Sequence, residues 1–164
     1  MKITGEWLSG FSDGEACFMV CIAKKFNQYN VAYAIRLRAD DAKVLENIRK
    51  FFGNIGTINI SSKEYVSKYD NANRNAVAYY RIASIKDLYE KVIPIFVKYP
   101  LKSKKSKDFI IWKQIIELLY QTLHKKKSRK LIKPLLEQLI DDLHQVKKFG
   151  EDSYVSKKTF IFSE

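Results

Sequence analysis

The sequence is poor in residues that form covalent or metal cross-links. Its 164 residues include only two cysteines, Cys17 and Cys21, and two histidines. Two thiols are too few for a disulfide framework, and without a histidine nearby they make a poor metal site. We therefore expect free, buried or half-buried thiols in a protein that works in a reducing, intracellular setting.

Long apolar runs are also missing. No stretch approaches the roughly 20 residues that a membrane span needs. The longest candidate near the start, residues 16–23, is far shorter and follows Asp13 and Glu15. Acidic residues just before an apolar run are not typical of a signal peptide. The sequence therefore predicts neither a membrane span nor a signal peptide.

Acidic residues are the third shortage. Lys plus Arg number 30 against 18 Asp plus Glu, which gives a formal net charge of +12. The hydrophobic fraction of 46% excludes a disordered basic tail, because such a tail could not bury so much apolar surface. We expect one domain at residues 1–150 and a polar tail at 151–164. A polyanion is the expected partner, with nucleic acid first and an anionic membrane surface second.

The basic residues gather in clusters. Any single run is most simply a solvated loop or helix end. Several runs in one small domain favour contacts with phosphates, and such binding weakens steeply with salt. The clusters are Lys102, Lys104, Lys105 and Lys107; then Lys125, Lys126, Lys127, Arg129 and Lys130; and then Lys147, Lys148, Lys157 and Lys158.

Hydrophobic periodicity predicts an α+β fold. Thr4 caps a short helix that stops near Gly14. Asp40 or Asp41 caps a second helix, and Pro94 is expected to kink a third one at 85–98. The predicted strands are 16–25, 31–38, 56–66 and 76–83, and two further helices are predicted at 108–124 and 131–148. This order predicts four antiparallel strands covered by helices on one face.

The uncovered face of this sheet is predicted to be polar and basic, and such a face can lie in the major groove of DNA. On the first strand only Lys25 is polar on that side, so Met19, Cys21 and Ala23 offer apolar contact or shape fit. The candidates for base or backbone contacts are Lys25, Arg36, Arg38, Thr57, Asn59, Ser61, Lys63, Asn75, Tyr79 and Arg81.

The first helix has an unusual pattern of glycines and acids. Gly10 and Gly14 lie four apart, which lets a second backbone come close, although each glycine costs about 1 kcal/mol relative to alanine. The alternative is that Gly14 is a cap and Gly10 is incidental. Asp13 and Glu15 lie at the C-terminal end, where the helix dipole disfavours negative charge and a divalent cation would compensate. Two such helices packed together would form a site for Mg²⁺-assisted phosphodiester hydrolysis.

The segment Leu8-Ser9-Gly10-Phe11-Ser12-Asp13-Gly14-Glu15-Ala16 resembles the motif of the LAGLIDADG homing endonucleases. The order of elements is similar to the αββαββα core of that family over nearly the whole chain. Two more stretches resemble the family, Arg36-Leu37-Arg38-Ala39-Asp40-Asp41 and Tyr99-Pro100-Leu101-Lys102-Ser103-Lys104-Lys105. The sequence departs from the motif at Ser9, Glu15 and Ala16, where the family has alanine, aspartate and glycine.

The resemblance implies a site-specific homing endonuclease with extra C-terminal helices. A chain with one motif implies a C2 homodimer that binds a long, near-palindromic double-stranded DNA site and cuts both strands. Such a break initiates intron or intein-type mobility. The implied cofactor is Mg²⁺ or Mn²⁺, and Ca²⁺ is expected to support binding without cleavage.

The resemblance also assigns roles to residues. It implies that Glu15 and the carbonyl of Gly14 bind the metal, and that Lys104 is the active-site lysine, with Lys105 as its rival. Arg38 matches a position near the scissile phosphate or contacts a base or the backbone, and Asp13 is structural. The implied dimer interface is Leu8, Gly10, Phe11 and Gly14, and Lys102, Lys105 and Lys107 are implied to contact DNA.

Two alternative functions use the same scaffold. One is an intron RNA maturase, whose basic surface would lie on the helical face near residues 125–130. The other is a DNA-binding regulator that does not cleave. The acid at Glu15 and the lysine at Lys104 argue against the regulator.

Overall fold

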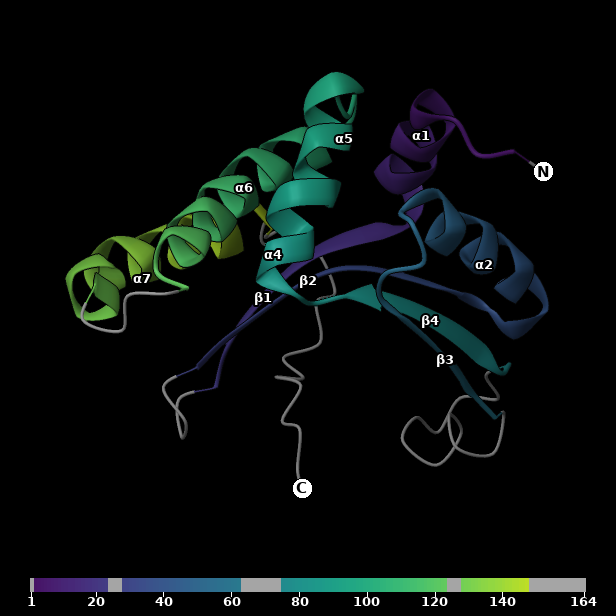
Figure 1. Cartoon of the computed structure of the whole chain (residues 1–164), viewed down its shortest axis with the longest axis horizontal. Helices are drawn as coiled ribbons and strands as arrows, with labels where there is room; N and C mark the ends of the chain where they lie inside the picture. Colours follow the sequence, from purple (N-terminus) through teal and green to yellow (C-terminus); the bar gives the residue numbers. More distant parts are fainter. Residues whose placement is uncertain (1, 24–27, 63–74, 124–127, 148–164) are drawn as a thin grey trace.

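A four-stranded antiparallel sheet carries its helices on one face (Figure 1). The computed structural model describes residues 2–23, 28–62, 75–123 and 128–147. The elements are α1 (Gly5–Glu15), β1 (Ala16–Ala23), β2 (Gln28–Arg38), η2 (Ala39–Asp41), α2 (Ala42–Phe51), β3 (Thr57–Ser61), β4 (Val77–Ile82), α4 (Ile85–Asp87), η3 (Leu88–Val92), α5 (Ile93–Lys98), α6 (Lys105–Gln121) and α7 (Ser128–Lys147). The predicted α+β class and order of elements are confirmed.

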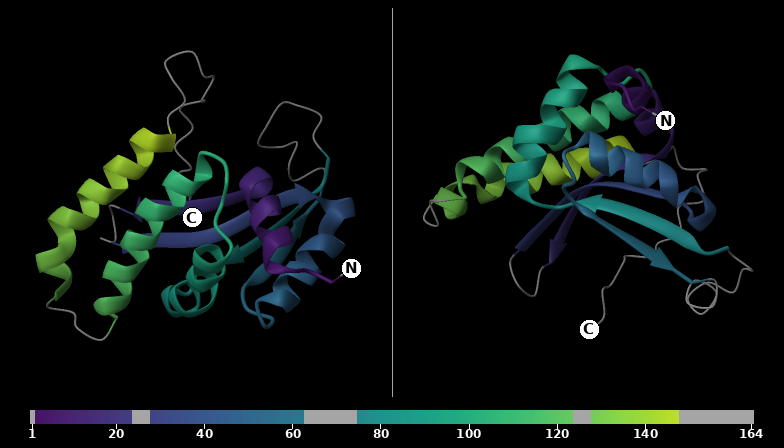
Figure 2. Two further views of the ribbon diagram at one scale, coloured as in Figure 1. Left: turned by 90° about the horizontal axis from the view of Figure 1, so that it is seen from above. Right: turned by 45° about the vertical axis from the view of Figure 1, so that its right-hand side comes forward.

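The strands lie in the order β1-β2-β4-β3. Alternate residues of β2 point to opposite faces, as the sequence predicts, and Tyr33 and Ile35 are fully buried beneath the helices. Arg36 pairs with Tyr79 of β4, which in turn pairs with Asn59 of β3, so these three side chains share the other face. Two further views show that no described helix covers that face (Figure 2).

Aromatic side chains form the centre of the core between sheet and helices. The Phe18 ring lies 5.6 Å from Phe96 and 5.1 Å from Trp112, measured between ring centroids. The indole of Trp112 also donates a hydrogen bond of 3.1 Å to the carbonyl of Met19. Lys147, at the end of α7, donates to the carbonyl of Phe18. These contacts attach α6 and α7 to the edge strand β1.

Pro94 is accommodated by a change in helix type. The predicted helix at 85–98 is present as three joined segments, α4, the π-helical turn η3 and α5. Proline has no N–H to donate to the preceding turn, and a wider π-turn is one common way to absorb that loss. The irregularity thus falls just before Pro94, which occupies the first turn of α5.

The predicted cap of the second helix is wrong in its detail. Asp41 does occupy the residue before α2, but neither Asp40 nor Asp41 makes a side-chain capping hydrogen bond there. A 3-10 turn, η2, leads into the helix, and Asp40 pairs with Arg38 instead. Among the later helices, α6 begins three residues before the predicted Asp108, and α7 begins at Ser128.

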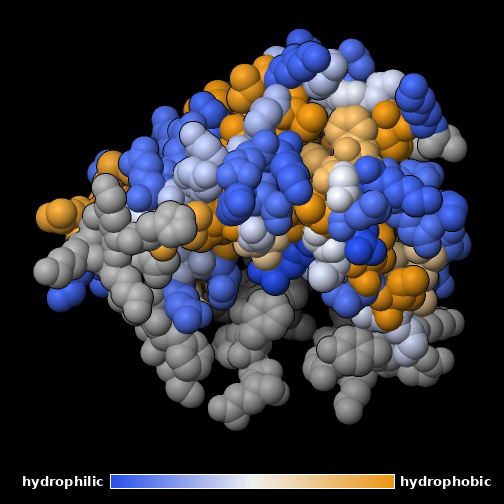
Figure 3. Space-filling view, viewed as in Figure 1, coloured by the Kyte–Doolittle hydropathy of each residue, from blue (hydrophilic) through white to orange (hydrophobic). Residues whose placement is uncertain are grey.

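Hydrophilic side chains cover much of the side seen in Figure 3, and apolar ones gather near the top, where α5 and α1 lie next to each other. Val97 of α5 is 57% exposed. In the described ranges, no helix has the length and apolar character to cross a membrane. The predicted tail at 151–164 lies outside the described residues.

Two glycines after α2 have different structural demands. Gly53 and Gly56 both have positive φ, +75° and +77°. A methyl group on Gly53 would meet nothing within 4 Å, whereas on Gly56 it would lie 2.6 Å from the carbonyl oxygen of Arg81. Close packing against β4 therefore adds to the conformational requirement only at Gly56.

We expect Gly56→Ala to destabilise the fold far more than Gly53→Ala. The Gly53 change places alanine in the left-handed region, which costs about 1 kcal/mol. The Gly56 change adds a collision with backbone, which brings the loss to about 3 kcal/mol or more. Urea denaturation of both variants measures the difference, and equal losses would contradict the close approach.

Candidate active site

Helix α1 buries one side and leaves the other open. Thr4 caps it by accepting a hydrogen bond of 3.2 Å from the N–H of Trp7, as predicted. Ser12 is fully buried, and its hydroxyl lies 2.8 Å from that of Tyr33. On the opposite side, a methyl group added to Gly10 or Gly14 would meet no described atom within 4 Å beyond the adjoining backbone of α1 itself.

One member of the predicted dimer interface is wrongly placed. Leu8 is fully buried in the core of its own chain, because it lies on the same side of the helix as Ser12. Phe11 is half-buried and stacks on Trp7, with the ring centroids 4.7 Å apart. Gly10 and Gly14 therefore form the open part of α1, which we call the glycine strip.

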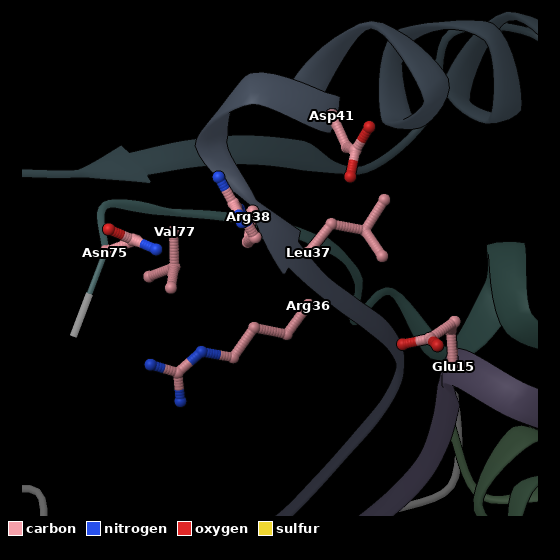
Figure 4. A pocket seen from close by; sticks show the side chains of 7 residues that line it. All are labelled: Glu15, Arg36, Leu37, Arg38, Asp41, Asn75 and Val77. Atoms are coloured by element: carbon pink, nitrogen blue, oxygen red, sulfur yellow. The ribbon is translucent and has the colours of Figure 1, made fainter.

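Glu15 ends α1 and lies exposed at one end of a shallow hollow of about 690 Å³. Residues 36–38 of β2 run through the middle of the hollow, and Asn75 and Val77 line its far end (Figure 4). Asp41 also borders it. The hollow thus joins the acidic end of α1 to the basic face of the sheet.

Arg38 lines the hollow and is held by a neighbouring acid. Its Nη2 lies 2.6 Å from Oδ2 of Asp40, and its Nε lies 3.2 Å from Oδ1. Both side chains are more than 60% exposed, so solvent screens this pair and its contribution to stability is small. Asp40 thus holds the Arg38 guanidinium near the hollow. Because the pair is weak, Arg38 could leave Asp40 for another acceptor at little cost in free energy.

Asp13 points away from the hollow and binds the segment that leads into α6. Its carboxylate accepts from the N–H of Lys102 at 2.7 Å and from the N–H of Ser103 at 3.2 Å. The Ser103 hydroxyl donates to it at 2.8 Å and itself accepts from the N–H of Lys105 at 3.1 Å. These bonds support the predicted structural role of Asp13 and extend it to a segment about 90 residues later.

The lysine that reaches the end of α1 is Lys105. Its ammonium donates to the carbonyl of Ser12 at 3.1 Å and to that of Gly14 at 2.9 Å. Partial burial lowers the pKa of Lys105, while Cys17, Glu15 and Asp13 act in the opposite direction. The Ser12 carbonyl also accepts from the N–H of Ala16, and the added ammonium compensates the negative end of the helix dipole.

The sequence favoured Lys104 over Lys105, and the geometry favours the rival. Lys104 is exposed at the residue before α6, whereas Lys105 is half-buried within its first turn. Side chains of neighbouring residues on a helix point about 100° apart, so the position of the first turn of α6 determines which lysine faces α1. The predicted helix begins at Asp108, which places both lysines in a loop and gives no basis for choosing between them.

A divalent cation would find only part of a coordination shell in one chain. No cluster of three His, Cys, Asp or Glu side chains that could hold a metal occurs among the described residues. Glu15 and the Gly14 carbonyl are hard oxygen donors of the kind that Mg²⁺ prefers, but Asp13 is committed elsewhere. Glu15 and the Gly14 carbonyl could therefore supply part of an octahedral coordination shell, and other ligands would have to complete it.

The predicted DNA contacts fall mostly on the face of the sheet that lies away from the helices. The strand register places seven of them there, namely Arg36, Arg38, Thr57, Asn59, Ser61, Tyr79 and Arg81. Lys25 and Lys63 lie outside the described residues, Asn75 lines the hollow, and Lys102 and Lys107 are exposed.

Three details of this face differ from the expectation or go beyond it. Cys17 and Cys21 are exposed rather than buried, because they lie on the outer side of β1. The Tyr79 hydroxyl donates to the sulfur of Met19 at 3.2 Å, and burial raises the pKa of Tyr79. Nε of Arg81 is buried and has no hydrogen-bond partner in the described part of the chain. A buried guanidinium N–H without a partner is suited to an acceptor from outside the chain.

Comparison with known proteins agrees with this architecture. A sequence profile described as LAGLIDADG endonuclease matches residues 8–116. The chain is 32% identical over 125 residues to "Probable intron-encoded endonuclease 2" of Neurospora crassa, a match that covers 73% of this chain and 25% of that protein.

Solved structures with the same fold include two at 29% identity. The LAGLIDADG meganuclease I-AabMI, bound to uncleaved DNA, matches with a TM-score of 0.63 over 88% of this chain and 43% of its own. The homing endonuclease I-TnaI matches with a TM-score of 0.63 over 90% of this chain and 100% of its own. The chain thus spans about a quarter of the Neurospora protein and less than half of I-AabMI.

We expect Asp13→Ala to loosen the segment that leads into α6, because the N–H groups of Lys102 and Ser103 lose their acceptor. Amide hydrogen exchange by NMR should become at least tenfold faster at those two residues. Asp40→Ala is the matched control, since that exposed acid pairs with Arg38 and is not bonded to this segment in the described part of the chain. Unchanged protection in Asp13→Ala would mean that its hydrogen bonds do not hold the segment.

Proposed function

The chain belongs to the LAGLIDADG endonuclease family, and we propose that it is a site-specific homing endonuclease that hydrolyses both strands of double-stranded DNA with a divalent metal ion. The observation that carries this proposal is the position of Glu15. It is an exposed carboxylate at the end of α1, beside a half-buried lysine and continuous with a basic sheet face.

The sheet face supports DNA as the substrate. Arg36, Arg38 and Arg81 bring three positive charges to it, and Thr57, Asn59 and Ser61 add groups that hydrogen-bond to bases or phosphates. The Nε of Arg81 is unpaired among the described residues, so little would hold this side chain back from turning toward an acceptor on DNA. I-AabMI, which has the same fold, was solved on DNA.

The proposed chemistry uses residues at the end of α1. Glu15 and the Gly14 carbonyl would hold Mg²⁺ or Mn²⁺, which activates water and offsets charge on the phosphate. Lys105, already beside Gly14, supplies a positive charge that stabilises the developing negative charge on the phosphate. Arg38 contributes in the same way once its exposed pair with Asp40 exchanges for a phosphate oxygen.

A second α1 is proposed to pack on the glycine strip. Of the two described carboxylates at the end of α1, only Glu15 lies outside the hydrogen bonds to the segment before α6, and a twofold partner would add a second such carboxylate next to it. The absence of any atom within 4 Å of a methyl added to Gly10 or Gly14 leaves room for the partner's backbone. I-TnaI, which is matched over its whole length, is another chain with a single copy of this fold, and we propose a homodimer on a near-palindromic site.

The two alternative functions, an intron RNA maturase and a non-cleaving DNA-binding regulator, are distinguished from the endonuclease by the experiments below. The basic run that would serve intron RNA, residues 125–130, lies partly outside the described part of the chain, which omits 124–127. The regulator would retain DNA binding without using Glu15.

Glu15→Gln is expected to abolish cleavage while leaving DNA binding in place. The amide keeps the size of the side chain but removes the negative charge that attracts the metal. Cleavage of a site selected from a randomised plasmid library in Mg²⁺ should fall at least 100-fold. The dissociation constant for the same site in Ca²⁺ should change less than threefold.

The same assay separates the two lysines. Lys105→Ala should lower the cleavage rate far more than the matched Lys104→Ala. Full cleavage by Glu15→Gln would overturn its role as metal ligand. Failure of the unaltered chain to cut any library member, with binding intact, would favour the regulator, and binding of intron RNA that survives Glu15→Gln would favour the maturase.

Gly10→Leu tests the partner helix. The side chain enters open solvent in a single chain, and leucine has a better helix propensity than glycine by almost 1 kcal/mol, so the fold should be at least as stable. The same side chain prevents close approach of a second α1. Sedimentation should show loss of the dimer, with Gly10→Ala intermediate, and a fully dimeric Gly10→Leu protein would exclude the glycine strip as the interface.

A further inference from the structure

The outer face of the sheet is divided into a polar half and an apolar half. On the side of β3 and β4 it carries Arg36, Thr57, Asn59 and Arg81. On the side of β1 the described outward residues are Cys17, Met19, Cys21 and Ala23, none of which has a charged or amide side chain. Beside Cys21 and Ala23, β2 adds the exposed amide side chains of Asn30 and Gln28, so the apolar half is limited to β1 and begins at Cys17 and Met19.

Tyr79 extends the apolar half across the middle of the sheet. Its hydroxyl reaches the sulfur of Met19 on β1, although β2 lies between their two strands. On β2, Tyr79 pairs with Arg36, and the next outward residues, Ala34 and Ala32, are buried at 2% and 0% exposure. Met19 and the Tyr79 ring, joined by this hydrogen bond, therefore form a continuous surface, which we call the apolar band.

The chemistry of the major groove offers one complement to such a band. The base edges there present donors and acceptors, and the only apolar group is the C5-methyl of thymine. The exposed Cys21 continues the band along β1, two residues beyond Met19. Alternate residues of a strand lie roughly 7 Å apart, close to the length of two base-pair steps, so successive outward side chains can meet methyl groups along one groove.

We propose that the apolar band recognises thymine methyl groups within the DNA half-site, with Met19, Cys21 and the Tyr79 ring as the specificity-determining contacts. This inference rests on the proposed DNA-binding function. Two observations favour DNA as the partner of the band. The band adjoins the arginines on the same face of the sheet. The Tyr79 hydroxyl already donates to the Met19 sulfur, so Tyr79 presents mainly its apolar ring to a partner.

The test removes methyl groups one at a time. A duplex selected from a randomised library is resynthesised with deoxyuridine in place of each thymidine, which deletes only the C5-methyl, and binding is measured in Ca²⁺. Loss of one buried methyl should weaken binding about fourfold at one to three positions of each half-site. In the Met19→Ala variant the same replacement should have almost no effect at the position that Met19 contacts.

Asn59→Ala is the matched control, because it alters the polar half and should leave the sensitivity to deoxyuridine unchanged. Cys21→Ser provides a second variant at an exposed site where folding is not at risk, and it should abolish the methyl effect at a neighbouring position. Replacements that all change affinity less than twofold would overturn the proposal. So would methyl effects that persist unchanged in both Met19→Ala and Cys21→Ser. A chain that binds no duplex would instead contradict the proposed function.

Discussion

The crowding of negative charge at the end of α1 is the constraint on which the candidate site depends. Free carbonyls and two carboxylates converge there, where the helix dipole already disfavours anions. The fold resolves this by dividing the acids. The Asp13 carboxylate accepts hydrogen bonds from two backbone N–H groups and a serine hydroxyl. The Lys105 ammonium donates to the carbonyls of Ser12 and Gly14. Glu15 is left as the exposed acid, beside a lysine whose position follows from the same hydrogen bonds.

This arrangement links three surfaces that serve different tasks. The buried side of α1 is fixed to the sheet through Ser12 and Tyr33, and its other side is the open glycine strip. The end of the helix leads directly into β1, so Glu15 lies next to the strand that carries Met19, and β2 and β4 join that strand to the basic half of the face. A partner at the glycine strip and DNA on the sheet can therefore meet at Glu15 without competing for the same residues.

Much of this could be predicted from the sequence, and the reasons for the exceptions are physical. Alternation in β2 and the motif around Gly10 depend on local periodicity, which a sequence displays directly. Leu8 was misplaced because the motif marks the helix without saying which residues turn inward. The sequence does not favour Lys105, because the segment before α6 donates hydrogen bonds to Asp13, a residue about 90 positions earlier whose contact periodicity does not show. The reach of Tyr79 to Met19 likewise depends on the strand order β1-β2-β4-β3, which periodicity does not contain.

The lysine at the end of α1 has a consequence for how the protein can change. Many small metal-binding domains fold only when their ion is present, so the ligands are also structural supports. Here the Lys105 ammonium binds a carbonyl of the helix end and two loop N–H groups bind Asp13, so the proposed metal ion would have no such structural role. Folding and the proposed catalysis are thus separate requirements on the same few residues. A scaffold of this kind could exchange Glu15 for another residue and still keep its fold.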